Sequence, residues 1–182
     1  MPAVAESEQL PVKQAREGKP EAWDALFRRY QLPLYVYVFE LVRHEQTSLD
    51  LVQETFIAAA RHIGGLRDDE KFGGWLFGIA HQKCLRHWRR GGREIPVEEP
   101  PESPDAFEAG PDDLLIRREQ EAEFMELLSQ LPPVRRSALV LHFLEDFSIE
   151  EIARITETPP GTVKSRIFHA KKSLRKLLEE QK

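Results

Sequence analysis

The sequence contains a single cysteine, Cys84, among its 182 residues. One thiol cannot form an internal disulfide, so no disulfide framework holds the fold, and the composition fits a reducing compartment. No apolar run approaches the roughly 18 residues that a membrane span needs, and the opening MPAVAESEQL lacks the basic and apolar segments of a secretory signal. We therefore expect a cytoplasmic protein that does not insert into membranes.

The sequence also lacks the patterns of common enzymes. It contains no glycine-rich phosphate loop and no nucleophile motif. His81, Cys84 and His87 recur at a three-residue spacing, but they spread over about 120° of one helix and have no fourth ligand nearby, which does not make a closed zinc site. We expect no enzymatic activity, no cofactor and no bound metal.

Charge is distributed unevenly along the chain, whose net charge is −5. Residues 94–126 carry 12 Asp or Glu against 2 Lys or Arg, whereas the blocks on either side are mildly basic. Within those blocks, residues 81–93 hold five Lys or Arg and residues 161–178 hold six, and neither stretch contains an acidic residue. The sequence therefore predicts two basic faces separated by an acidic segment.

Residues 94–113 contain five prolines and eight acidic residues but few apolar ones. Proline and charge repulsion favour an extended chain, so this stretch is predicted to be a linker. At about 3.1 Å per residue it would reach roughly 60 Å, long enough for domains on either side to bind one DNA duplex well apart.

Helical spacing of apolar residues dominates the part before the linker. One amphipathic run begins near Trp23 and resumes after Pro33, which is expected to break or kink it. Thr47 and Asp50 form a candidate capping box for the next helix. A glycine-bounded loop, 64–74, then precedes a helix that opens at Trp75 and continues into the basic stretch.

The part after the linker has the same character. Pro133 suits the first turn of a helix, and Ser148 with Glu151 forms a capping box for a short helix. The following basic helix carries one inward apolar stripe: Val163, Ile167, Ala170, Leu174 and Leu177. A short helix, a tight turn and a long basic helix form a helix-turn-helix. We predict an all-α fold with two small helical domains, 10–93 and 114–182, joined by the acidic proline-rich linker.

The basic helix is a candidate DNA-binding element. With its apolar stripe turned inward, six side chains are expected to face outward: Lys164, Ser165, Phe168, His169, Lys171 and Lys172. Cations on such a face can position the DNA backbone, while side chains near the helix start can reach base edges in the major groove. The alternative is an ordinary solvated basic face.

The stretch 81–93 is a second candidate nucleic-acid surface, because it mixes Trp88 and two histidines with its cations. Aromatic rings between cations suit strand backbones and unstacked bases. The alternative is that Trp88 belongs to the hydrophobic core.

Four segments of the sequence are considered together: DLVQETFIAAARHI (50–63), FGGWLFGIA (72–80), LPPVRRSALVLHFLEDFSIEEIARI (131–155) and GTVKSRIFHAKKSLRKLL (161–178). In this order they resemble the extracytoplasmic-function (ECF) group of bacterial RNA polymerase sigma factors. The resemblance implies that 10–93 is a sigma region 2 domain, which binds core polymerase and recognises and melts the −10 element. It implies that 114–182 is a region 4 domain, which recognises the −35 element.

The resemblance also implies residue roles. Three residues are expected to contact the β′ clamp helices of core polymerase: Asp50, Gln53 and Glu54. Seven are expected to contact −10 DNA: Arg67, Lys71, Trp75, Lys83, Arg86, Arg89 and Arg90. Another seven are expected to contact −35 DNA: Thr162, Lys164, Ser165, Arg166, Phe168, His169 and Lys172. Where the family pattern has Asn and then Asp, this chain has Gln82 and Arg86.

The implied partners are core RNA polymerase (β′ and β subunits), double- and single-stranded promoter DNA and an anti-sigma factor, and the free chain is expected to be monomeric. The acidic linker either mimics RNA in the polymerase channel or serves as a spacer. The alternative from another functional class is a free-standing helix-turn-helix regulator that binds an operator without polymerase.

The residue His169 leads to a first testable prediction. Many relatives carry arginine at this position, and histidine is shorter and lacks the guanidinium fork that contacts guanine. We expect His169→Arg to change the preferred −35 sequence, measured by selecting bound promoters from a randomised pool. An unchanged preferred sequence would contradict the assignment of His169 to the DNA interface.

Overall fold

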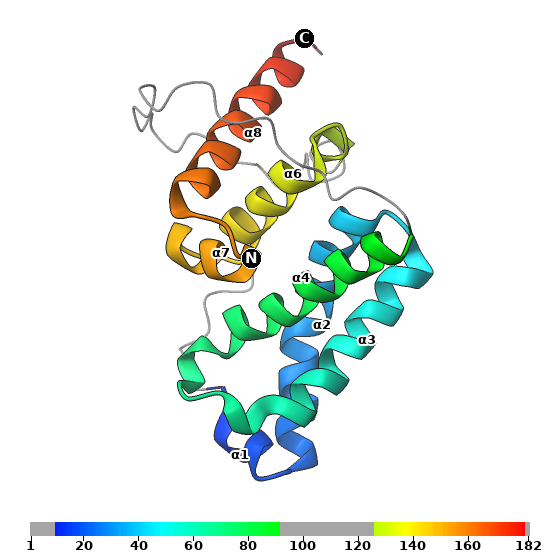
Figure 1. Cartoon of the computed structure of the whole chain (residues 1–182), viewed down its shortest axis with the longest axis vertical. Helices are drawn as coiled ribbons and strands as arrows, with labels where there is room; N and C mark the ends of the chain where they lie inside the picture. The colour runs from blue at the N-terminus through cyan, green and yellow to red at the C-terminus, as the bar shows by residue number, and fades with distance from the viewer. Residues whose placement is uncertain (1–9, 92–125, 181–182) are drawn as a thin grey trace. The chain divides into compact units, whose positions relative to one another are not determined.

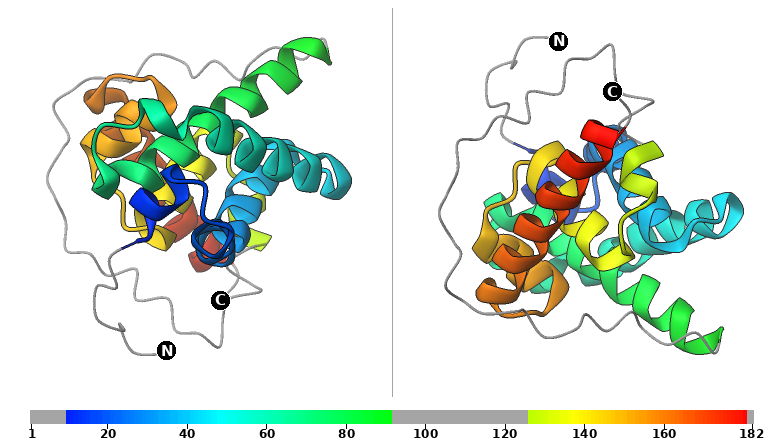
Figure 2. Two further views of the ribbon diagram at one scale, coloured as in Figure 1. Left: turned by 90° about the horizontal axis from the view of Figure 1, so that it is seen from below. Right: turned by 90° about the horizontal axis from the view of Figure 1, so that it is seen from above.

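The computed structural model describes residues 10–91 and 126–180. Within these ranges every regular element is a helix, so the predicted all-α class is confirmed (Figures 1 and 2). The chain divides into two compact units, 1–84 and 85–182. The predicted linker, 94–113, lies outside the described residues, and the predicted domain limits stay predictions. None of the described helices is both long and apolar enough to cross a bilayer.

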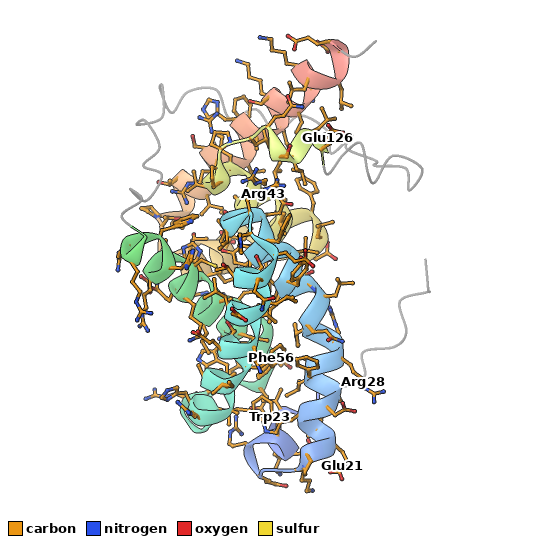
Figure 3. The ribbon with its side chains drawn as sticks, turned by 90° about the vertical axis from the view of Figure 1, so that its right-hand side faces the viewer. Glu21, Trp23, Arg28, Arg43, Phe56 and Glu126 are labelled. Atoms are coloured by element: carbon orange, nitrogen blue, oxygen red, sulfur yellow. The ribbon has the colours of Figure 1, made fainter. Side chains whose placement is uncertain are left out.

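The first unit is built around one long helix. Its elements in order are α1 (Val12–Arg16), α2 (Pro20–Val42), α3 (Glu45–His62), the 3₁₀ turns η1 (Ile63–Gly65) and η2 (Asp69–Lys71), and α4 (Phe72–Arg90), whose last turns pass into the second unit. α3 packs along α2, and α1 packs against α2 and η1. Figure 3 shows Phe56 of α3 on the side that meets α2.

A continuous buried face runs along α2. Leu26, Leu34 and Tyr37 are fully buried, and the Tyr37 ring meets the Phe77 ring of α4 at 5.5 Å between centroids. The helix continues through Pro33, so of the predicted break or kink the break does not occur. A proline inside a helix costs about 3 kcal/mol, and the packed residues on both sides of it hold the two halves together.

The start of α3 also differs from the prediction. Its N-cap is His44, whose Nδ1 accepts a hydrogen bond from the Thr47 backbone N–H at 3.2 Å. The predicted capping box of Thr47 and Asp50 is therefore wrong, and Asp50 instead accepts a hydrogen bond from Gln46 at 3.0 Å. The reason is the abrupt end of α2: Arg43 adopts a left-handed conformation with φ 55°, which turns the chain straight into α3.

The second unit contains the predicted helix-turn-helix. Its described elements are α6 (Pro133–Leu139), the π-helical turn η5 (Val140–Leu144), α7 (Ile149–Thr156) and α8 (Pro160–Glu180). α6 and α7 both pack on α8. Pro133 occupies the first turn of α6 as expected, and the buried Arg136 side chain donates to the Ser129 carbonyl at 2.9 Å, which caps the preceding helical turn.

Two local predictions for this unit are confirmed. Ser148 and Glu151 form a reciprocal capping box: the Ser148 N–H donates to Glu151 at 2.8 Å, and the Glu151 N–H donates to Ser148 Oγ at 3.2 Å. The predicted apolar stripe of α8 is buried from Val163 to Leu174, while Leu177 is partly exposed. Glu157 directly follows α7, and its left-handed φ of 51° makes the turn into α8.

The lone cysteine lies in the core. Cys84 of α4 is fully buried and its thiol is free, and burial raises the pKa of this thiol to about 12 from the model-compound value of 9.0. Burial disfavours the thiolate because a charge in an apolar surrounding lacks water to solvate it. The neutral thiol therefore acts as a small apolar core group.

We expect the Cys84 thiol of the folded protein to react about a thousandfold more slowly with a disulfide reagent at pH 8 than that of the urea-unfolded chain, because far less thiolate is present. The folded pKa is above the unfolded one, so this contribution to stability is complete below about pH 9 and is lost as the pH rises toward 12. Cys84→Ala should lack this particular pH dependence. Equal labelling rates in both states would contradict the buried position.

Candidate polymerase and nucleic-acid interfaces

The outer face of α3 carries the three residues predicted to bind polymerase. Asp50, Gln53 and Glu54 are all exposed on the side of the helix opposite its buried stripe. Two apolar side chains that the sequence reasoning missed are exposed beside them: Leu49, 48% exposed, and Ile57, 46% exposed.

Leu49, Gln53 and Ile57 follow one another at intervals of four residues, so they form one line on the helix surface. The signal for them was present in the sequence, since both apolar residues fall outside the buried stripe of α3. An exposed apolar pair rimmed by polar groups is typical of a protein-binding surface.

One predicted DNA contact is instead paired within the protein. Lys83 of α4 donates to Glu54 of α3 at 3.1 Å, and its side chain is only 18% exposed. The structure thus joins a residue predicted to bind −10 DNA to one predicted to bind polymerase. In this conformation the ion pair links α4 to α3.

The segment between α3 and α4 presents two of the predicted −10 residues. Arg67 and Lys71 are exposed, and Lys71 forms an ion pair with Asp68 at 3.1 Å. The hydrogen bond from Lys71 lowers the pKa of Asp68 from 3.8. Trp75, also predicted for −10 DNA, is partly exposed in the first turn of α4, where its ring lies 5.9 Å from that of Phe72.

The last turns of α4 display the remaining predicted cations. Arg86, Arg89 and Arg90 are exposed on one face of the helix. Trp88 is buried, with 5% of its surface exposed. The prediction of an aromatic ring among the cations of this patch is therefore wrong for Trp88, and the core alternative is confirmed.

The histidines of α4 do not assemble a metal site. His81 is buried and its Nδ1 lies 2.7 Å from the Tyr37 hydroxyl, so the ring is held in the protein core. Among the described residues, no group of three or more His, Cys, Asp or Glu side chains is placed to hold a metal ion.

α8 carries the predicted −35 surface. Lys164 and Lys172 are exposed, whereas Thr162, Arg166, Phe168 and His169 are partly exposed. The rings of Phe168 and His169 meet edge to face at 5.4 Å between centroids.

One side chain expected to face outward from α8 is buried, and a second is partly exposed and contacts a neighbouring ring. Ser165 is only 8% exposed. The Lys171 ammonium lies over the Phe143 ring at 4.8 Å from its centroid. The cationic surface of α8 is therefore narrower than the sequence suggested.

Comparison with known families assigns both parts of the chain. Residues 26–94 match the model for sigma-70 region 2, and residues 121–174 match the model for sigma-70 region 4. The RNA polymerase sigma-H factor of Pseudomonas aeruginosa is 33% identical, with 96% of this chain and 95% of that protein covered. The ECF RNA polymerase sigma-E factor of Escherichia coli K12 is 31% identical, with 92% of each covered.

Solved structures agree with these matches. CnrH, solved in complex with the cytosolic domain of CnrY, shares the fold with a TM-score of 0.66 at 23% identity, covering 96% of this chain and 99% of that one. The sigma factor RpoE of Bartonella quintana, solved with the anti-sigma factor NepR, has a TM-score of 0.61 at 26% identity, covering 85% and 96%. This chain therefore belongs to the ECF group of bacterial RNA polymerase sigma factors, which direct transcription initiation at promoters.

Proposed function

We propose that this sigma factor binds core polymerase through the outer face of α3 and recognises promoters through two basic faces, one on and before α4 and one on α8. The observation that carries the proposal is the pair of exposed cationic helix faces, on α4 and on α8, in one chain. Each is positioned by an apolar stripe on the opposite side of its helix, so packing in either unit keeps the cations available to DNA.

The first basic face suits the −10 element. Arg67 and Lys71 precede α4, and Arg86, Arg89 and Arg90 end it, so exposed cations lie at both ends of the helix. A cationic track of this kind can follow the backbone of an opened strand, and the partly exposed Trp75 ring can stack on an unpaired base. We assign Lys83 a supporting role, because it is paired with Glu54.

The second basic face suits the −35 element. Lys164 and Lys172 are free to contact phosphates on the flank of α8, which positions the helix without specifying sequence. Phe168 and His169 lie nearer its amino-terminal half and can reach base edges in the major groove. Ser165 remains in the proposed interface through its position on the helix, although its side chain is shielded.

A free-standing operator-binding regulator would use α8 alone. It would leave the exposed Leu49, Gln53 and Ile57 of α3 and the cations of α4 without a function. The comparisons do not favour it, since both sigma regions match.

We also propose that a protein inhibitor binds this chain and that the chain acts where transcription takes place. The Bartonella structure holds an anti-sigma factor and the CnrH structure holds the cytosolic domain of CnrY, so a dedicated anti-sigma partner is proposed here as well. The chain contributes specificity to the active site of the polymerase, has no catalytic reaction of its own and acts in the bacterial cytoplasm.

The decisive experiment adds the purified chain to sigma-free core polymerase and genomic DNA from the source bacterium, and maps transcript starts. We expect discrete starts that share two upstream elements. Random starts, together with no complex on gel filtration, would reject the proposal and leave operator binding as the function.

Gln53→Lys tests the polymerase surface. A long cation in the centre of the line from Leu49 to Ile57 should weaken core binding about tenfold or more, because it cannot be buried against an apolar partner without loss of hydration. Gln14→Lys makes the same change at an exposed position on α1 and serves as the control. Fluorescence titration with core polymerase measures both, and equal affinities would exclude this face of α3.

A further inference from the structure

Arg16, the last residue of α1, holds the segment that joins α3 to α4. Its Nη2 donates to the Leu66 carbonyl at 3.0 Å and to the Asp69 carboxylate at 2.5 Å. Its Nε also donates to the Ile63 carbonyl at 3.5 Å. One guanidinium therefore contacts both ends of segment 63–69 from a position about 50 residues earlier in the chain.

Helix α1, which carries Arg16, is itself held in place. Val12 and Ala15 of α1 are buried, and the Trp23 indole N–H of α2 donates to the Ala15 carbonyl at 3.0 Å. Figure 3 shows Trp23 where α1 meets α2. Arg16 thus extends from a helix that is packed and hydrogen-bonded to the long helix of the unit.

The held segment needs such an anchor. Gly64 and Gly65 have open space around them, and glycine leaves the backbone unusually free. The exposed Arg67 lies in the sequence between two of the residues that Arg16 contacts, Leu66 and Asp69. The contacts therefore restrict the part of the backbone that carries Arg67.

The geometry points to Arg16 as a positioning residue for −10 recognition: it holds segment 63–69 so that Arg67 meets the opened DNA strand in one defined place. This inference rests on the proposed function, since it assigns a support to the same DNA surface. Preorganising a flexible segment improves binding because less freedom is lost when the ligand arrives.

The alternative is that the ion pair of Arg16 and Asp69 only stabilises the fold. The exposure of the two side chains argues against this alternative. The side chains of Arg16 and Asp69 are 32% and 41% exposed, and ion pairs this exposed contribute little to folding stability. Removal of the contact should therefore leave the unit folded while it frees the segment. The pair of Arg28 and Asp24 on α2, at 3.0 Å, is an exposed pair outside the proposed interfaces and provides a matched control; Figure 3 shows Arg28 directed away from α3.

The test compares wild type with Arg16→Ala, Arg16→Lys, Asp69→Asn and, as the control, Arg28→Ala, all as holoenzymes. The fluorescence of a base analogue in the −10 element reports strand opening. The base preference is measured with a pool of promoters whose −10 element is randomised. We expect Arg16→Ala to slow opening about tenfold and to flatten the −10 preference. Arg16→Lys and Asp69→Asn should have intermediate effects, because each keeps only part of the fork of hydrogen bonds, and Arg28→Ala should match wild type.

Melting temperature, core affinity and −35 binding should change little in all of these variants. If the loss of opening instead follows the melting temperature, or if the −10 preference of the folded variants equals that of wild type, the inference is overturned. If Arg16→Ala does not fold, Arg16→Lys and Asp69→Asn decide. A wild-type holoenzyme without promoter-specific starts would reject the proposed function, whereas equal opening by wild type and variants would reject only the role of Arg16.

Discussion

Burial of one face of α2 is the constraint on which the first unit depends. Tyr37, fully buried on that face, meets Phe77 and His81 of α4. With those side chains turned toward α2, the cations of α4 at positions 86, 89 and 90 must point to solvent. The basic surface is therefore a consequence of how the apolar stripe packs, since a helix cannot bury both faces with so little apolar surface.

In the second unit, too, burial of the apolar face of one helix sets the arrangement. The stripe from Val163 to Leu174 fixes the rotation of α8, and α6 and α7 both pack against this helix. The capping box of Ser148 and Glu151 fixes where α7 begins, and the left-handed Glu157 fixes where it ends. These local devices give the two helices a defined turn between them, which is what a helix needs to enter a DNA groove in one orientation.

Contacts between helices of the first unit connect surfaces that the sequence treats as separate. Glu54 belongs to the proposed polymerase face, whereas the sequence alone predicted Lys83 to contact −10 DNA, yet they form one ion pair. Arg16 lies outside both faces but contacts the segment that presents Arg67. The proposed polymerase face and the proposed −10 face are thus supported by Lys83 and Arg16, which contact neither polymerase nor DNA in the proposal.

The sequence by itself determined the helical class, the helix-turn-helix, the Ser148 capping box, the first turn of α6 and most of the buried stripe of α8. Those features arise within three or four residues of one another, where period and capping chemistry decide the outcome. It misplaced the start of α3, which depends on how α2 ends at Arg43. It also left open a break in the helix at Pro33, through which α2 continues. Only the tertiary structure decided that Trp88 is core, that Lys83 is paired and that Arg16 holds segment 63–69. The physical reason is distance along the chain: Lys83 and Glu54 are 29 residues apart and Arg16 and Asp69 are 53 apart, so no local pattern records that the fold brings them together.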